Sequence, residues 1–150
     1  MGKRVRKKVP RVALPIVWKH ETKTQVVGLA VNDDDVYAGN DKGELVVLSR
    51  AAGLLRRTFK VPRAVRCIAV GADGAFAGCN DGSIYDISGD KARARRRVAP
   101  EMGIDWIEAH RGRLYVSDHE GGLTAFDVEG NVLWERRRSE ERRVGKECRL

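Results

Sequence analysis

The sequence predicts an all-β protein that contains three copies of one four-stranded antiparallel unit. The first observation behind this prediction is an internal repeat, because segments that begin at Val26, Val65 and Asp105 align without gaps over most of their length. The second is that short apolar runs alternate with turn residues, and the third is that no long helical periodicity interrupts them. Four columns keep one interval of 39 residues: Tyr37, Phe76 and Tyr115; Leu45, Ile84 and Leu123; Leu29, Ile68 and Ile107; Gly43, Gly82 and Gly121.

The first unit shows the expected order of the strands. An apolar run over Val26–Val31 has the length of a strand and ends at the turn sequence NDDD. Further strands are expected over residues 36–40, 44–49 and 54–61. The tight turn between the second and third strands contains Gly43, which can take the positive φ that a hairpin requires. The other two units repeat this order, with NDG and HEG in the same turn.

Four-stranded units that repeat about every 40 residues are typical of β-propellers, whose sheets pack face to face around an axis. The segment Arg113–Glu135 resembles a repeat of the quinoprotein-type (PQQ-like) propellers, with Gly130 and Trp134 at the places of their glycine and docking tryptophan. The stretch EGGLTAFD is also similar to the end of a WD repeat, with Phe126 and Asp127 where Trp and Asp would stand. The other two units depart from both patterns. The resemblance implies a propeller scaffold and no bound quinone.

The excess positive charge of the chain lies at its two ends. The formal net charge is +8, yet residues 12–137 hold equal numbers of acidic and basic residues. We therefore expect a basic N-terminal arm over 1–11, a partial propeller with an N-terminal strand and three blades over 12–137, and a non-native tail over 138–150. The tail contains RSEERRVGKEC, which resembles a translated sequencing adapter; a genuine charged tail is the alternative. Because closed propellers have about four to eight blades, we expect the natural ring to be longer than this fragment.

Residues 11–19, RVALPIVWK, are expected to form the outermost strand of a blade whose other strands are absent. Trp18 lies within one residue of the place that the repeat gives to the tryptophan at the end of a blade. Pro15 is compatible with an edge strand, which can spare one backbone donor. We expect this strand to flank the first unit without pairing into its sheet.

The repeat also predicts one ion pair. Val27, Arg66 and Asp105 lie at the same position of adjacent innermost strands. Arg66 and Asp105 are therefore expected to face each other near the channel of the propeller.

The sequence offers no set of catalytic or metal-binding residues. His20, His110 and His119 are separate from one another, whereas a metal site needs several convergent ligands. Cys67 and Cys79 have no nearby histidine in their unit and are interpreted as buried, inert residues. We therefore expect a protein that is not an enzyme and binds no metal or cofactor. Cysteines at unrelated spacings favour an intracellular protein, cytoplasmic or nuclear.

The function that the sequence favours is a scaffold that presents loops to a protein partner. In a propeller the turns between second and third strands, and the linkers between blades, emerge on one face. The candidate partner-binding residues on these turns and linkers are Asn40, Asp41, Lys42, Arg63, Asn80, Asp81, Glu101, Asp118, His119 and Glu120. Each of them also suits a turn for reasons of backbone geometry alone.

The residues leave two alternative functions open. In the first, the basic N-terminal arm anchors the propeller on nucleic acid, although no aromatic residues are interleaved with its charges. The candidate nucleic-acid contacts are Lys3, Arg4, Arg6, Lys7 and Lys8. In the second, the chain is a fragment of a quinoprotein-like enzyme. The arginines of Ala92–Arg97 are interpreted as charge that protects an outer edge strand, and no segment is long and apolar enough to predict a membrane span.

Overall fold

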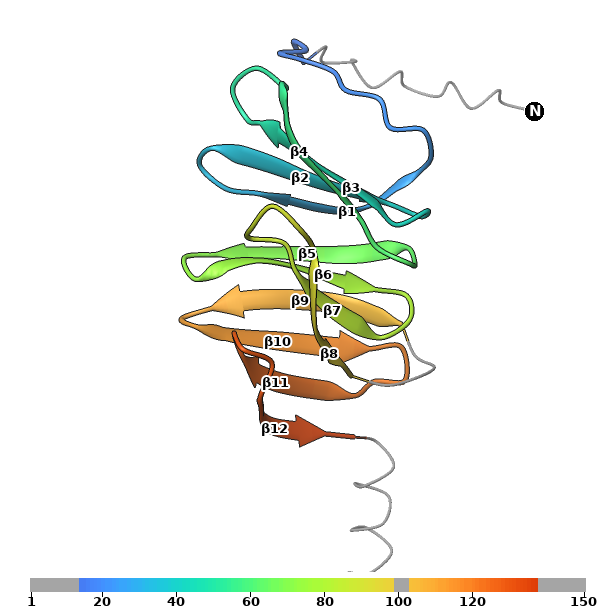
Figure 1. Cartoon of the computed structure of the whole chain (residues 1–150), viewed down its shortest axis with the longest axis vertical. Coiled ribbons are helices and arrows are strands. Elements are labelled where there is room, and N and C mark those ends of the chain that lie inside the picture. The colour runs from blue at the N-terminus through green and yellow to red at the C-terminus, as the bar shows by residue number, and fades with distance from the viewer. Residues whose placement is uncertain (1–13, 99–102, 138–150) are drawn as a thin grey trace, which may run out of the picture.

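The computed structural model describes residues 14–98 and 103–137, and within these ranges the chain forms strands and turns only. Twelve strands are arranged in three sheets of four (Figure 1). Every sheet is antiparallel, with its strands in chain order, which confirms the predicted all-β class and the four-stranded repeat. No helix of the described residues is long and apolar enough to cross a membrane.

Each sheet corresponds to one predicted unit, and we call the sheets blade one, blade two and blade three. Blade one contains β1 (Val26–Val31), β2 (Asp35–Asn40), β3 (Glu44–Ser49) and β4 (Leu55–Lys60). Blade two contains β5 (Val65–Gly71), β6 (Gly74–Cys79), β7 (Ser83–Asp86) and β8 (Arg93–Arg97). Blade three contains β9 (Ile104–His110), β10 (Arg113–Asp118), β11 (Leu123–Asp127) and β12 (Val132–Arg136).

The first three strands of all three blades share one register. First and second strands pair Ala30 with Tyr37, Ala69 with Phe76, and Glu108 with Tyr115. Second and third strands pair Tyr37 with Val47, Phe76 with Asp86, and Tyr115 with Ala125. Because each pair follows its predecessor by 39 residues, the period in the sequence is also the period of the hydrogen-bonded ladders.

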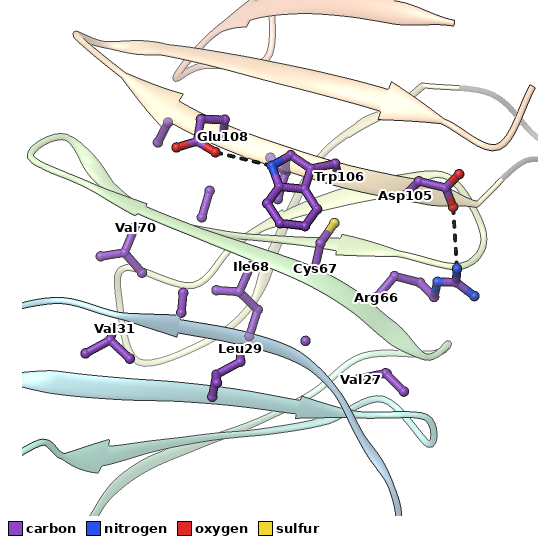
Figure 2. A pocket seen from close by; sticks show the side chains of 15 residues that line it. Val27, Leu29, Val31, Arg66, Cys67, Ile68, Val70, Asp105, Trp106 and Glu108 are labelled. Carbon is purple, nitrogen blue, oxygen red and sulfur yellow. Dashed lines mark hydrogen bonds and ion pairs between the residues drawn. The ribbon is translucent and has the colours of Figure 1, made fainter. Parts of the chain in front are cut away.

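A β-bulge recurs at one place of each innermost strand. The residues that the ladder skips are Val27 in β1, Arg66 in β5 and Asp105 in β9. A bulge residue is unpaired and leaves the strict alternation of the strand. The three predicted equivalent positions are thus equivalent in the structure, and each side chain lies at the same end of its strand (Figure 2).

The blades pack face to face through two apolar layers. We call the face of a blade toward the preceding blade its leading face and the opposite face its trailing face. The first layer joins the trailing face of blade one, with Tyr37 and Leu45, to the leading face of blade two, with Val65 and Ile68. The second layer joins blade two to blade three through a cluster that includes Phe76, Ile84, Ile104, Leu114 and Val116. These side chains are nearly all removed from solvent, which makes the two layers the core of the protein.

Two arginines on fourth strands donate hydrogen bonds to the next blade. Arg57 on β4 donates from Nη1 to the carbonyl oxygens of Ser88 (3.0 Å) and Gly89 (2.9 Å), just after β7. Arg96 on β8, which follows Arg57 by one repeat, donates from Nη1 to the carbonyl oxygen of Gly130 at 3.4 Å. We call these side chains inter-blade donors, because they connect an outer strand to the turn before the next outer strand.

Trp18 occupies the place of a third inter-blade donor, since it precedes Arg57 by one repeat. Its Nε1 donates to the carbonyl oxygen of Arg50 at 2.8 Å, in the turn before β4. A Cβ added at Gly53 would lie 2.6 Å from the indole, so the ring rests directly on this turn. The sequence therefore predicted the position of Trp18 relative to blade one correctly.

The expectation of an N-terminal strand over Arg11–Lys19 is wrong for its described part, residues 14–19. These residues form no strand, and Leu14, Ile16 and Val17 are more than four-fifths exposed. A strand needs a neighbouring strand to pair its backbone N–H and C=O groups. The four strands of blade one do not offer a fifth place to this segment, in agreement with the expectation that it would not join that sheet.

Candidate protein-interaction face

The turns between second and third strands lie along one edge of the molecule, on the right in Figure 1. Their glycines adopt nearly the same φ, which is 81° at Gly43, 82° at Gly82 and 83° at Gly121. Side chains other than hydrogen disfavour this region of φ, which explains why each unit has a glycine here. The structure thus brings the predicted turn residues to one edge on backbones of the same shape.

Two of the predicted partner-binding residues, Asn40 and Asp118, are buried within their turns. They are 1% and 4% exposed. The Oδ1 atom of each accepts hydrogen bonds from the backbone N–H groups two and four residues later, at 3.0 and 2.9 Å for Asn40 and at 3.0 and 2.8 Å for Asp118. Bonds of this kind fix a turn. Both side chains therefore hold the backbone of their turns in place and are not exposed to a partner.

The turn of blade two is fixed in a different way. Cys79 stands at the position of Asn40 and Asp118, and it is fully buried and offers no carboxyl or amide oxygen. Here the Oδ1 atom of Asp81 accepts a hydrogen bond from the backbone N–H of Ser83 at 3.0 Å. The shared glycine keeps the turn in place although the buried residue has changed.

The other predicted partner-binding residues differ in their exposure to solvent. Six of them are exposed at this edge: Asp41, Lys42, Arg63, Asn80, His119 and Glu120. Asp81 is half-buried because it holds its own turn. Glu101 and the five basic residues of the N-terminal arm lie outside the described residues.

The predicted ion pair between Arg66 and Asp105 is present at the same edge. Nη2 of Arg66 lies 3.4 Å from Oδ1 of Asp105, and Nδ1 of His119 lies 3.4 Å from Oδ2 of the same carboxylate (Figure 2). All three side chains are more than a third exposed, so the Arg66–Asp105 pair contributes about 1 kcal/mol or less. Its structural effect is to connect two neighbouring inner strands with the turn of blade three.

Arg137 is a residue that the sequence reasoning missed. Its Nη1 lies 3.0 Å from Oδ2 of Asp118, whose side chain is 1% exposed, and its Nη2 donates to the carbonyl oxygen of Val98 at 3.3 Å. A buried carboxylate needs such a partner. Arg137 therefore neutralises the charge beneath the turn of blade three and ties the end of β12 to blade two.

The inner strands form the wall of a concave region of about 550 Å³, which Figure 2 shows from close by. Residues 27–31, 66–70 and 105–109 line it. Leu29, Val31 and Trp106 are each more than half exposed on this wall. The Nε1 atom of Trp106 donates to Oε2 of Glu108 at 3.2 Å. Most of the lining side chains are thus apolar, and the charged ones lie at both ends, with Arg66 and Asp105 at one end and Glu108 toward the other (Figure 2).

The thiols are held in a form that does not react. Burial raises the pKa of Cys67 and of Cys79 to about 12 in each case. The thiolate is the nucleophile and the metal ligand, and it is scarcely populated at neutral pH for such a group. Within residues 14–98 and 103–137, no three histidine, cysteine, aspartate or glutamate side chains are grouped so that they could hold a metal ion.

Comparison with known proteins identifies the architecture. No protein-family model matches the sequence, and no curated protein matches it either. Solved propeller structures do resemble it. BamB from Moraxella catarrhalis superposes with a TM-score of 0.69 and 18% sequence identity, over 81% of this chain and 39% of BamB. The WD40 repeats of RRP9 give a TM-score of 0.69 and 14% identity, over 79% of this chain and 40% of that one.

A third similar structure was solved together with a partner. It is Chaetomium thermophilum Sqt1 bound to the N-terminus of the ribosomal protein L10, with a TM-score of 0.67, 18% identity, and coverage of 77% of this chain and 36% of Sqt1. At these identities the similarity establishes the fold, which is that of PQQ-like and WD-type propeller blades. The chain spans about two-fifths of the length of these three structures.

Proposed function

We propose that this chain is part of a propeller that binds a protein partner through its turn face, which we define as Asp41, Lys42, Arg63, Asn80, Asp81, His119 and Glu120. The observation that carries the proposal is the repetition of one rigid turn along one edge. Each turn is fixed by a glycine with φ between 81° and 83°. Residues that are ordered before binding lose less conformational entropy when a partner arrives. Rigid turns with exposed polar tips therefore suit recognition.

The charges of the turn face favour a polar partner surface with both signs of charge. Acidic and basic side chains both occur along the edge, with Asp41, Asp81 and Glu120 among the acidic residues and Lys42 and Arg63 among the basic ones. Complementary charges at an interface contribute specificity and association rate more than affinity. The partner in the Sqt1 structure, the N-terminus of a ribosomal protein, is a protein segment. That example supports the same class of partner for this chain.

We propose binding rather than catalysis for the same site. The turn face lacks a nucleophile beside a base, and both thiols of the described chain are protonated at neutral pH. Binding of nucleic acid by the basic arm is the second candidate, which the six basic residues within positions 1–11 favour. Affinity for DNA or RNA that falls steeply with salt, and is lost when residues 2–11 are deleted, would select this candidate.

The proposal can be tested with ligands selected from a displayed peptide library on the immobilised 150-residue chain. We expect the combined variant Asp41→Ala, Lys42→Ala, Glu120→Ala to weaken binding about tenfold or more, which corresponds to roughly 1.4 kcal/mol. Asp34→Ala is the matched control, because Asp34 is an exposed acidic turn residue at the opposite edge. Equal binding by the triple variant and the wild type would refute the proposal.

A further inference from the structure

A second concave region lies at the edge opposite the turn face, between the turns that join first to second strands in blades two and three (on the left in Figure 1). Its volume is about 190 Å³. Residues 71–74 of blade two form one wall, residues 109–113 of blade three form the other, and Phe76 and Val128 also line it. We call it the arginine groove, after the two arginines of its second wall. Both walls belong to the described residues, so the groove does not depend on where the sequence begins or ends.

The wall from blade three presents three side chains that can donate hydrogen bonds to an anion. They are His110, Arg111 and Arg113, all of which are exposed. Within the part of the chain that the structure describes, none of these side chains has a hydrogen-bond or ion-pair partner. Asp73 on the opposite wall is also exposed, and its Oδ2 lies 3.4 Å from where a Cβ at Gly112 would be. This carboxylate thus lies against the turn without pairing with either arginine, and both guanidinium groups are available to a ligand.

The same turn in blade one uses its polar side chains to hold itself. Oδ1 of Asn32 accepts hydrogen bonds from the backbone N–H groups of Asp34 at 3.0 Å and Asp35 at 2.7 Å. Oδ1 of Asp35 also lies 3.2 Å from Nε of Arg56. The sequence NDDD of this turn corresponds to HRGR two repeats later, in blade three. In HRGR the charged side chains hold nothing in the described chain, so their contribution to the fold does not explain them.

The backbone of the turn in blade three does not explain Arg111 either. Its φ is 47° and that of Gly112 is 72°. A two-residue hairpin turn with positive φ at both positions is of type I′, which strongly prefers Asn, Asp or Gly at the first position. Arg111 is the one residue other than glycine with a positive φ in the described chain. A residue in such a conformation is a reason to look for a function at that place.

We propose that the arginine groove binds acidic side chains of a partner polypeptide, whose carboxylates meet the guanidinium groups of Arg111 and Arg113. An arginine binds a carboxylate through two parallel N–H···O bonds, in a geometry that lysine cannot copy. Both arginines belong to one short hairpin, which fixes the distance between their backbones. The groove lies at the opposite edge from the turn face, so this proposal does not rest on the function proposed above.

The surroundings of the groove favour a peptide over a nucleic acid. Asp73 lines the groove itself, and the acidic turn NDDD of blade one lies at the same edge. A regular chain of phosphates along this edge would meet these carboxylates, and like charges at an interface suppress the wrong partner. A peptide can instead place its carboxylates at the two arginines alone. The groove is also smaller than the roughly 300–1,000 Å³ of small-molecule sites, which suits side chains of a peptide.

Fluorescence anisotropy with the whole chain and a labelled peptide tests the proposal. The probe is a short Gly-Ser peptide with four glutamates, and the matched peptide has glutamine in their place. We expect the glutamate peptide to bind about tenfold more tightly or better, and Arg111→Asn and Arg113→Gln each to weaken it about tenfold. Asp73→Asn should strengthen binding, because it removes a like charge from the groove. Arg93→Asn is the control, since Arg93 is an exposed arginine of the outer strand β8 that does not line the groove.

Thermal unfolding of Arg111→Asn separates binding from a structural role. Asparagine is favoured at this turn position, so the variant should be at least as stable as the wild type while it binds the glutamate peptide less well. A variant that unfolds earlier and binds unchanged overturns the proposal.

Two further outcomes would also overturn it. One is equal binding of the glutamate and glutamine peptides by the wild type. The other is a single-stranded RNA that displaces the glutamate peptide and needs both arginines, because the site would then recognise phosphates. A turn-face ligand, identified by its loss of binding to the triple variant at that face, should not displace the glutamate peptide. Because the two sites lie at opposite edges, either proposal can fail while the other holds.

Discussion

The inner three strands of each blade and its fourth strand follow different rules. The inner strands keep one register through all three blades, whereas the fourth strands do not. In blade one Val47 of β3 pairs with Arg57 of β4. Its equivalent in blade two, Asp86, pairs with Arg93, which lies three residues before the position that the 39-residue period predicts. Its equivalent in blade three, Ala125, pairs with Trp134, which lies one residue before the predicted position. All residues of β8 and β12 are exposed.

This difference between inner and fourth strands shows where strand register is physically constrained. A shift of one residue turns every side chain of a strand to the opposite face, so register is strongly specified where one face is buried. The inner strands of each blade bury at least one face against a neighbouring blade, and a slip would place the apolar side chains of that face in water. The fourth strands carry charged residues on the rim, where a shift costs little. Exposed arginines on β8 also agree with the expected protection of an edge strand.

The largest effect should follow from removing a buried inner side chain. Phe76→Ala is expected to lower the free energy of unfolding by about 3–5 kcal/mol, because it leaves a cavity between blades two and three. Tyr115→Ala is the matched variant, at the same repeat position but without a following blade. We expect it to cost less than half as much in urea denaturation of dilute protein. Equal losses would contradict the view that burial between blades gives this position its importance.

A second comparison separates backbone strain from close contact at the turns. Gly43 and Gly121 have φ values of 81° and 83°, but a Cβ at Gly43 would lie 2.2 Å from the carbonyl oxygen of Val61, while one at Gly121 would meet nothing within 4 Å. Gly121→Ala should cost about 1–2 kcal/mol from φ alone. Gly43→Ala should cost more, about 3 kcal/mol, because the linker must also move. Thermal unfolding of both variants measures the difference, and equal costs would show that contact with the linker is unimportant.

The sequence could predict the features that recur at the 39-residue interval, but not those that depend on how side chains pack in three dimensions. The period predicted the strands, the turn glycines and the pair of Arg66 with Asp105, because these features repeat or pair at one interval. It could not predict that Asn40 and Asp118 are buried under their turns, since turn sequences favour the same residues whether or not they are covered. Nor could it predict that Arg137 reaches Asp118, because this contact depends on how the end of β12 lies against the turn of blade three.

The contacts that fourth strands make with the next blade were also beyond the sequence. Arg57, for example, donates to two carbonyl groups of blade two. The acceptors are backbone atoms, which leave no signal in the residue types. The tail from Arg138 and the basic arm lie outside the described residues, so the expectations of a non-native tail and of a basic arm stay predictions.

The pairing of Arg137 with Asp118 should be the strongest polar contribution near the rim. Arg137→Ala leaves a carboxylate that is 1% exposed without its cation, and we expect a loss of about 1–3 kcal/mol. Arg137→Lys keeps the charge but cannot reach both Asp118 and the carbonyl of Val98 with a planar fork. It should lie between Ala and wild type in urea denaturation. A Lys variant as unstable as the Ala variant would show that charge contributes nothing here.

The inter-blade donors should contribute less, because they lie on the variable fourth strands. Arg57→Met retains most of the apolar stem and removes the hydrogen bonds to Ser88 and Gly89, so we expect a loss of about 1 kcal/mol. Arg96→Met removes a single bond of 3.4 Å and should cost less. Thermal unfolding of the two variants ranks the contacts. A larger loss for Arg96 than for Arg57 would mean that bond number and length do not set the order.

The weakest protection of backbone amides from hydrogen exchange is expected in residues 14–17, which form no strand. Residues 14–17 have no backbone partner in a sheet, although Trp18 holds the segment against the turn at Gly53 through its indole. Amide hydrogen exchange reports the opening of backbone hydrogen bonds, so the amides of Leu14, Ile16 and Val17 should exchange at nearly the rate of an unfolded peptide. Amides in β6, which pairs on both sides, should be protected as strongly as the global stability allows. Trp18→Ala should leave the exchange of residues 14–17 unchanged and should not alter β6. Slow exchange of Val17 would instead show that this segment has a strand partner, and the distinction between paired inner strands and an unpaired outer segment would then have to be abandoned.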